Sequence, residues 1–251
     1  GLDNFREIKD NLQGEVLGVV VWTVAFAAIT TVLNFSIGVV LAFLLNNPNM
    51  PERSLYRTIL ILPWALPASI MILVWSGLLN TDYGPINILL QNLHLGKVPW
   101  LDDPNWARFS VLLVNAWIGF PFMMTACLGA LQSISPDLTE AALVDGAGII
   151  TRFLRITFPL LRSATLPLVI SSFAYNLNNF GAVYLLTSGG PPRLGHIAGA
   201  TDILPSYTYT LAFANQRYGL ACAYAILIFF FIGTLSGLQM KFSRAFEEVD
   251  R

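Results

Sequence analysis

Residues 135–159, SPDLTEAALVDGAGIITRFLRITFP, form a polar, helix-patterned segment between two long apolar stretches of the chain. Ser135 suits the N-cap of a helix whose first residue is Pro136, where the missing N–H costs nothing. Glu140 then lies near the positive end of the helix dipole, where acidic side chains are favoured. Gly146 predicts the end of the helix. The segment is therefore expected to be a short helix on one membrane surface.

The order of residues in this segment resembles the EAA loop of ABC-importer permeases. The matching residues are Glu140, Ala141, Ala142, Gly146, Ile156 and Pro159, and the one departure is Phe158, where leucine is usual. In that family the loop docks as a coupling helix in a cleft of a cytoplasmic ATPase subunit. The resemblance implies ATPase-coupling roles for Glu140, Ala141, Ala142, Asp145 and Gly146. An ordinary amphipathic surface helix is the alternative interpretation.

The composition of the chain is that of a membrane protein. Of its 251 residues, 55% are hydrophobic and 12% are charged, and the mean hydropathy is +0.63. Soluble domains carry about 25% charged residues, so the composition excludes an ordinary soluble domain. The net charge of −1 gives no reason to expect a nucleic-acid partner. Cys127 and Cys222 both lie in apolar stretches, which favours buried thiols over a disulfide or a metal site.

Five stretches are long and apolar enough to cross a bilayer, which takes about 20 residues for roughly 30 Å of hydrocarbon. They contain no Asp, Glu, Lys, Arg or His, and they are Val16–Leu45, Ile59–Leu79, Phe109–Leu131, Thr165–Thr187 and Leu220–Met240. The sequence therefore predicts an all-α, polytopic membrane helix bundle. Its expected organisation is an external lead-in at residues 1–15, a transmembrane domain at 16–240 that includes the loop at 135–159, and a cytoplasmic tail at 241–251.

The distribution of basic residues weakly supports one orientation. With the 135–159 loop in the cytoplasm, eight of the fourteen Lys and Arg residues lie inside, which agrees in sign with the positive-inside rule. The direction depends mainly on the resemblance to the EAA loop. On the outer side, residues 86–95 have helical spacing but are too short to span, so they predict a surface helix. His94 and His196 are expected to be plain surface residues of the two outer loops.

The predicted fourth span carries a row of polar side chains at mid-depth. On one continuous helix, Ser172, Asn176 and Asn179 would fall within about 60° of arc, whereas Asn178 would point elsewhere. Amides are costly in hydrocarbon unless they are paired, so the row must face a neighbouring helix or a wet cavity. Polar side chains that join helices are one interpretation. The other is a binding surface for a neutral polyol, because amides and hydroxyls hydrogen-bond hydroxyls in both directions.

Prolines interrupt two other predicted spans, at Pro63 with Pro67 in the second and at Pro121 in the third. A proline inside a helix frees a carbonyl, which a membrane tolerates only where protein or water satisfies it. Simple bends, common in helical bundles, are the alternative to a cavity at these positions.

Residues 16–240 as a whole resemble the MalF type of permease subunit found in maltose importers. The resemblance is carried by VWTVAF, LILPWALP, NAWIGFPFMM, EAALVDGAG, ITFPLL and SSFAYNLNNFGAVYLLTSGGPPRLG. It implies the type I ABC-importer permease fold and a sugar site half-way across the membrane. The implied sugar-binding residues are Ser172, Asn176, Asn179 and Gly119, with Trp64 and Phe122 where the family has two tyrosines. Ala68 replaces a family serine, so three hydroxyls are absent while the aromatic surface is kept.

The expected function is that of a permease subunit of a binding-protein-dependent ABC importer for a sugar of the maltose or oligosaccharide kind. The resemblance implies several partners: a second permease subunit, two ATPase subunits that hold ATP and Mg, a periplasmic sugar-binding protein and the bacterial inner membrane. The chain has no G-x-x-x-x-G-K-[ST] phosphate loop, so no enzyme activity and no bound cofactor are expected of it.

An ABC permease for another neutral solute, such as a polyol or a glycerol phosphate-type compound, is the alternative function. An importer of an anion should show a basic group or an exposed helix N-terminus at depth, and the five stretches contain no basic residue. A secondary transporter normally keeps ionisable residues inside the membrane for ion coupling, so the same composition argues against that class.

Overall fold

The structure, a computed structural model, describes residues 2–10, 12–47 and 49–249, and every regular element in them is a helix. The elements include three π-helical turns, labelled η. In chain order they are α1 (Asp3–Asp10), η1 (Leu12–Val16), α2 (Leu17–Leu45), α3 (Arg53–Ala65), α4 (Ala68–Leu78), α5 (Pro85–Asn92), α6 (Pro104–Gln132), α7 (Pro136–Val144), α8 (Ile149–Arg152), η2 (Phe153–Thr157), α9 (Phe158–Leu177), α10 (Phe180–Thr187), α11 (Leu204–Tyr209), η3 (Thr210–Ala214) and α12 (Tyr218–Val249). The prediction of an all-α fold is confirmed.

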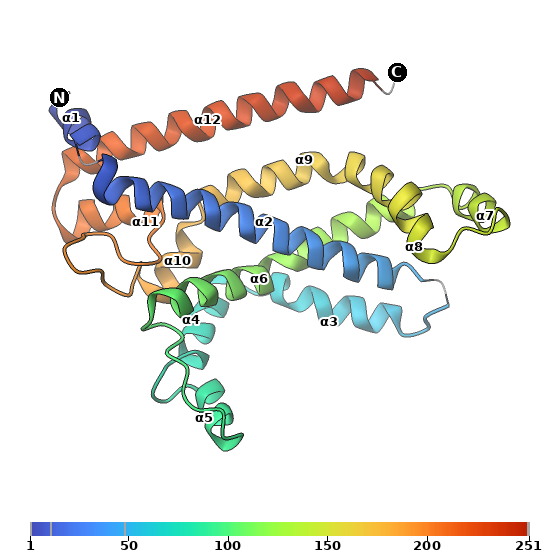
Figure 1. The fold of residues 1–251 in the computed structure, drawn as a ribbon, viewed down its shortest axis with the longest axis horizontal. Coiled ribbons are helices and arrows are strands. Elements are labelled where there is room, and N and C mark those ends of the chain that lie inside the picture. The colour runs from blue at the N-terminus through green and yellow to red at the C-terminus, as the bar shows by residue number, and fades with distance from the viewer. Residues whose placement is uncertain (1, 11, 48, 250–251) are drawn as a thin grey trace.

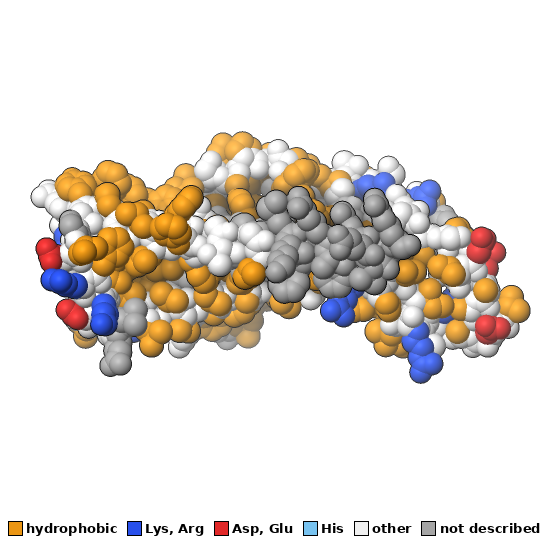
Figure 2. All heavy atoms as spheres, turned by 90° about the horizontal axis from the view of Figure 1, so that it is seen from above, with side chains coloured by type: hydrophobic (Ala, Val, Ile, Leu, Met, Phe, Trp, Pro, Cys, Tyr) orange, Lys and Arg blue, Asp and Glu red, His pale blue; other side chains and the backbone are white. Residues whose placement is uncertain are grey.

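The long helices run roughly along one axis of the molecule (Figure 1). Helices α7 and α8 lie at one end of this axis, whereas α1, α11 and the loop before α11 lie at the other. On the face seen in Figure 2, charged side chains gather mainly towards these two ends, and hydrophobic side chains cover much of the described surface between them. An apolar belt between two charged ends is the surface that a bilayer requires, because hydrocarbon solvates apolar side chains and excludes charges.

Three helical stretches of the described chain are long and apolar enough to cross a membrane: Gly14–Leu45, Pro104–Gln132 and Ile149–Leu177. The second predicted span is not one straight helix: α3 and α4 are apolar and long enough for a membrane span only as a pair, and the pair is bent by 91° at the break between them. The single crossing by this pair stays a prediction. The break is at Leu66, which is extended (φ −94°, ψ 150°) and directly precedes Pro67. A residue before proline is pushed out of the helical region, so the chain turns there.

The fourth predicted span is wrong at its C-terminal boundary. The helix ends at Leu177, and a separate short helix, α10, begins at Phe180. The fifth predicted span falls within α12, whose described apolar part is Tyr218–Thr234. The side chains of residues 239–251 lie outside the described part of the structure, so the crossing by α12 and the tail at 241–251 stay predictions.

Helix α2 is the centre of the bundle and packs lengthwise against α6 and α9. Phe26 of α2 and Met124 of α6 are fully buried in two of the hydrophobic clusters that hold these helices together. By contrast, only 11% of the apolar window of the α9 stretch is buried within the chain. Its outward side chains, such as Leu160 and Leu168, are exposed and apolar, which suits contact with lipid or with another subunit.

The loop between α4 and α6, predicted to be an outer loop, contains the predicted surface helix as α5, which ends at Asn92, three residues before the predicted end. Asn87 of α5 is buried and holds the loop together. Its Nδ2 donates to the carbonyl oxygens of Thr81 and Val98, and its Oδ1 accepts from the Val98 N–H and the Trp100 indole N–H. This arrangement fixes α5 without any crossing of the membrane.

Candidate functional site

A cavity of about 560 Å³ lies among α2, α3, α4, α6, α9 and α10. All six residues that the sequence predicts to bind a sugar line it: Trp64, Gly119, Phe122, Ser172, Asn176 and Asn179. Ala68, which stands where the family pattern has a serine, lines it as well. The structure therefore brings the polar row of Ser172, Asn176 and Asn179 together with Trp64, Gly119 and Phe122, which the sequence linked to that row only by resemblance.

Asn115 of α6 connects the predicted amides, and the sequence analysis did not single it out. Its Nδ2 donates to Oδ1 of Asn176 at 3.0 Å, and its Oδ1 accepts from Nδ2 of Asn179 at 3.0 Å. Asn115 lies one helical turn before Gly119, on the same face of α6. That spacing is the signal that could have found it.

Asn176 and Asn179 do not lie on one helix face, contrary to the prediction. Asn176 is in the last turn of α9, whereas Asn179 is the N-cap of α10, where its Oδ1 accepts from the Ala182 N–H at 3.4 Å. Asparagine favours caps because its side chain replaces a missing backbone partner. The break between the helices, rather than helical periodicity, brings the two amides to the same wall of the cavity.

Asn176 also joins three helices. It is 3% exposed, and its Nδ2 donates to the Ser172 carbonyl oxygen at 2.9 Å and to Thr31 Oγ1 of α2 at 3.3 Å. Both interpretations of the polar row thus have support: the amides pair across helices, and the same amides line the cavity. Paired amides in a low-dielectric interior form a rigid polar surface.

An aromatic face stands beside the amides. The ring centroids of Trp64 and Phe122 are 6.3 Å apart, and both side chains are substantially exposed where they line the cavity. Tyr175 adds a third, well exposed ring. Among the described residues that line this cavity there is no Asp, Glu, Lys, Arg or His. The chemistry available to a solute is therefore neutral hydrogen bonding and aromatic stacking.

Gly119 has a steric role in this wall. A Cβ added there would overlap the side-chain amide of Asn34 on α2, with Cγ at 3.0 Å and Oδ1 at 3.1 Å. Only glycine lets the Asn34 side chain lie flat against α6 at this point. Asn34 is a second lining residue that the sequence analysis did not single out.

The predicted coupling residues lie at the opposite end of the long axis from α1, on α7 and the turn after it (Figure 1). Ser135 occupies the N-cap and Pro136 begins α7 as predicted, although the Ser135 side chain makes no capping hydrogen bond. The helix ends in a Schellman motif: the Gly146 N–H donates to the Leu143 carbonyl oxygen and the Ala147 N–H to that of Ala142. Gly146 has φ +79°, so the predicted stop is confirmed.

Helix α7 contains no buried residue, and its apolar side chains are unusually open. Val144 is 88% exposed, and Leu138 and Leu143 are also exposed. Glu140, Ala141, Asp145 and Gly146 are exposed and Ala142 is half-buried. A short helix that projects small, apolar and acidic side chains away from its own bundle has the properties of a protein-docking element.

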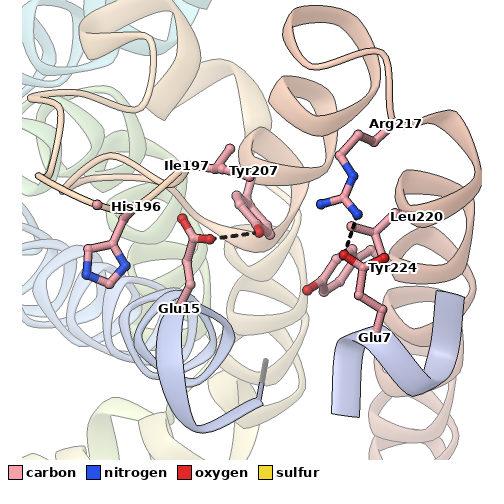
Figure 3. A pocket seen from close by; sticks show the side chains of 9 residues that line it. Glu7, Glu15, His196, Ile197, Tyr207, Arg217, Leu220 and Tyr224 are labelled. Carbon is pink, nitrogen blue, oxygen red and sulfur yellow. Dashed lines mark hydrogen bonds and ion pairs between the residues drawn. The ribbon is translucent and has the colours of Figure 1, made fainter. Parts of the chain in front are cut away.

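A second cavity of about 450 Å³ lies at the α1 end of the long axis, between α1, the loop before α11, and α12 (Figure 3). Its charged groups have partners: Glu15 accepts hydrogen bonds from the Tyr207 hydroxyl and the Ala198 N–H, and Arg217 forms an ion pair with Glu7. Burial, together with the nearby Glu15 charge, raises the pKa of Tyr207. These contacts tie the N-terminal segment to α11 and α12.

His196 lines this second cavity but is exposed, in keeping with the surface role predicted for it. Within the described part of the chain, no group of three or more His, Cys, Asp or Glu residues could hold a metal ion.

An all-α membrane bundle with a neutral, solute-sized cavity between its helices is the architecture of a membrane permease. Residues 34–246 match the sequence model of the "Binding-protein-dependent transport system inner membrane component" family. The chain belongs to this family of inner-membrane transport components.

Similar proteins include the "Maltose/maltodextrin transport system permease protein MalF" of Salmonella typhimurium, which is 45% identical over 251 residues. This match covers 97% of the chain and 49% of the relative. The protein of the same description from Photorhabdus laumondii is 46% identical, over 97% of the chain and 48% of the relative. The chain thus spans about half the length of these curated relatives.

Solved structures share the fold. A chain of a bacterial ABC transporter involved in the import of the acidic polysaccharide alginate superposes with a TM-score of 0.84 and 24% identity, over 98% of this chain and 84% of that one. A chain of the MetNI methionine ABC transporter superposes with a TM-score of 0.59 and 18% identity, over 94% and 97%. The predictions of an ABC-importer permease fold, of relatives of the MalF type and of an inner-membrane location are confirmed.

Proposed function

We propose that this chain is the pathway-forming part of a permease subunit in a binding-protein-dependent ABC importer for a neutral oligosaccharide of the maltose kind. The family match and the MalF relatives support the class of transporter. The observation that carries the choice of solute is the cavity, in which Asn115, Asn176 and Asn179 stand beside the Trp64 and Phe122 rings with no charged side chain among the described lining residues.

The chemistry of this cavity suits a sugar. Amides donate to and accept from hydroxyl groups, and an aromatic ring stacks on the apolar C–H face of a pyranose. The volume of about 560 Å³ lies within the range of roughly 300–1,000 Å³ that is typical of ligand pockets. We assign solute binding to Ser172, Asn176, Asn179, Gly119, Trp64 and Phe122, and we add Asn115.

In this proposal the chain itself is not an enzyme and binds no cofactor. A second permease subunit completes the pathway, two ATPase subunits bind ATP and Mg, and a periplasmic binding protein delivers the sugar. Closure of the ATPase subunits moves α7 through Glu140, Ala141, Ala142, Asp145 and Gly146, and the bundle then opens the cavity to the outside. The exposed apolar side chains of α7 and its glycine-terminated end support this docking role.

Another neutral solute, such as a polyol, is the second candidate. Trp64, Ala68 and Phe122 lack the hydroxyls that the resemblance would place there, so this cavity offers fewer polar partners than the family pattern. A glycerol phosphate-type compound fits less well, because no Lys, Arg or His is among the described lining residues to pair with a phosphate.

The test is uptake by the complete importer, with its partner permease, ATPases and binding protein, reconstituted in proteoliposomes. Labelled maltose, maltotriose, sorbitol and glycerol 3-phosphate are compared with and without ATP. We expect ATP-dependent uptake of the glucose oligosaccharides alone. Uptake of sorbitol alone would favour the second candidate, and uptake that is independent of ATP would contradict the proposed class of transporter.

A further inference from the structure

Asn34, in the middle of α2, has a buried amide oxygen that no described residue satisfies. The side chain is 4% exposed, and its Oδ1 has no hydrogen-bond partner within the described part of the chain. A buried amide oxygen normally has a partner, because leaving it unpaired forfeits the hydrogen bond that water would supply. An unpaired acceptor in a native structure therefore calls for a physical explanation.

The position of Asn34 points to a ligand. The residue lines the cavity of the proposed solute site, opposite the place where α6 carries Gly119. Contact with Gly119 holds the amide against α6, one helical turn from Asn115. One turn back on α2, Thr31 accepts a hydrogen bond from Asn176. Helix α2 thus contributes Asn34 to the lining of the site and holds Asn176 in place through Thr31.

The other amides of the site are already engaged. Asn115 bonds to Asn176 and Asn179, and Asn176 also bonds to Ser172 and Thr31. The Oδ1 of Asn179 accepts from the Ala182 N–H. The Asn34 oxygen differs from these because its capacity to accept is unused within the described chain. A solute hydroxyl in the cavity is the donor that this position fits.

We propose that Asn34 contacts the solute, with its Oδ1 accepting a hydrogen bond from one hydroxyl group of the bound sugar. The inference rests on the proposed function, since it requires a hydroxylated solute in this cavity. It makes Asn34 a specificity-determining residue: a hydroxyl at one ring position is required, and fluorine at that position is not equivalent because fluorine cannot donate.

Thr30 provides a matched control on the same helix. Its Oγ1 is also buried and without a hydrogen-bond partner in the described structure, but Thr30 does not line the cavity. A general effect of removing a buried oxygen from α2 would therefore appear in Thr30→Val as well as in an Asn34 variant. A solute contact would appear only in the latter.

The experiment measures kcat/KM for uptake by the complete importer in proteoliposomes, with the parent sugar and a set of its monodeoxyfluoro analogues. For the wild type, at least one analogue should lose about tenfold against the parent, the factor that corresponds to one hydrogen bond, and one of the sensitive positions is the hydroxyl that contacts Asn34. Asn34→Leu should lower uptake of the parent by a similar factor and abolish discrimination at that position alone. Thr30→Val should discriminate as the wild type does.

The inference is overturned if Asn34→Leu retains the full wild-type discrimination at every hydroxyl, whatever its effect on the parent sugar. If Asn34→Leu does not assemble, Asn34→Ala, which is smaller and also lacks a side-chain acceptor, is judged by the same criterion. A wild-type importer that takes up none of the sugars would instead contradict the proposed function, so the two failures are distinguishable.

Discussion

Asn115 on α6 donates from its side-chain nitrogen to the side-chain oxygen of Asn176 on α9, at 3.0 Å. Both side chains are buried, at 7% and 3% exposure. The two residues are 61 positions apart in the sequence. The hydrogen bond joins α6 to α9, and the two paired side-chain amides line the cavity. The geometry of the candidate site and the packing of the bundle therefore depend on the same hydrogen bond.

Replacing Asn115 with leucine should weaken both the packing of α6 against α9 and the binding of the solute. Asn176 and Asn179 would each lose a partner, and an unpaired buried polar group costs about 1–3 kcal/mol. We expect a lower unfolding temperature of the purified complex and reduced sugar uptake. Asn105→Ala, at an exposed position near the start of the same helix, is the control and should change neither. An Asn115→Leu complex with wild-type stability and uptake would contradict the network.

Gly119→Ala should disturb the contact between α6 and α2, because the new methyl group would overlap the amide of Asn34. The matched control is Gly129→Ala on the same helix, where an added Cβ meets nothing within 4 Å. Alanine is favoured over glycine in a helix by about 1 kcal/mol, so the control should be neutral or stabilising in thermal unfolding. The double variant Gly119→Ala with Asn34→Ala should regain stability; equal effects at both glycines would refute the steric role.

Gly146→Val should uncouple ATP hydrolysis from transport. Gly146 has φ +79°, and forcing a β-branched residue into this conformation costs about 1–3 kcal/mol, which would reshape the end of α7. Gly148→Val is the control, because Gly148 has φ −67° and ψ 165°, which valine adopts freely. We expect lower sugar uptake per ATP hydrolysed, or weaker ATPase association, for Gly146→Val alone. Normal coupled transport in that variant would count against the docking role of α7.

The stability of the loop between α10 and α11 should depend on pH through Asp202. Burial raises the pKa of this carboxyl, although it accepts hydrogen bonds from the Ser206 hydroxyl at 2.6 Å and the Gly199 N–H at 2.9 Å. A carboxyl with a raised folded-state pKa binds its proton more tightly in the folded state. Its contribution to stability therefore increases as the pH falls from the folded-state pKa towards about 4, the unfolded value.

Thermal unfolding of the complex across this pH window, in wild type and Asp202→Asn, measures the effect. The unfolding temperature of the wild type minus that of Asp202→Asn should increase as the pH falls. A difference that is constant with pH, or that moves the other way, would show that the buried carboxyl does not titrate as described.

Much of the architecture was predictable because membrane insertion constrains sequence strongly. The absence of charge from residues 16–45 and 109–131 predicted two long helices, which the structure has as Gly14–Leu45 and Pro104–Gln132. Pro136 and Gly146 predicted the ends of α7 because each acts through local backbone geometry. The broken α3–α4 pair was signalled by Pro63 and Pro67, but the prolines do not specify the angle of 91° between the two helices.

The polar site was predictable only in part. Ser172 and Asn176 belong to a recognisable polar row, whereas Asn34 is a single amide in an apolar stretch and Asn115 is signalled only by its one-turn spacing from Gly119. Their importance arises from contacts between helices far apart in the chain. Asn179 was linked to Asn176 by a helical periodicity that the break after Leu177 removes. Tertiary pairing, rather than local pattern, assembles this wall.

In the proposed function, the sugar is held in the cavity between the aromatic rings and the paired amides. An electron cryomicroscopy structure of the complete importer, trapped with bound sugar, shows where the sugar binds. We expect density for the sugar between the Trp64 and Phe122 rings and the amides of Asn115 and Asn176. A sugar bound elsewhere along the pathway, with these side chains packed against one another, would contradict it.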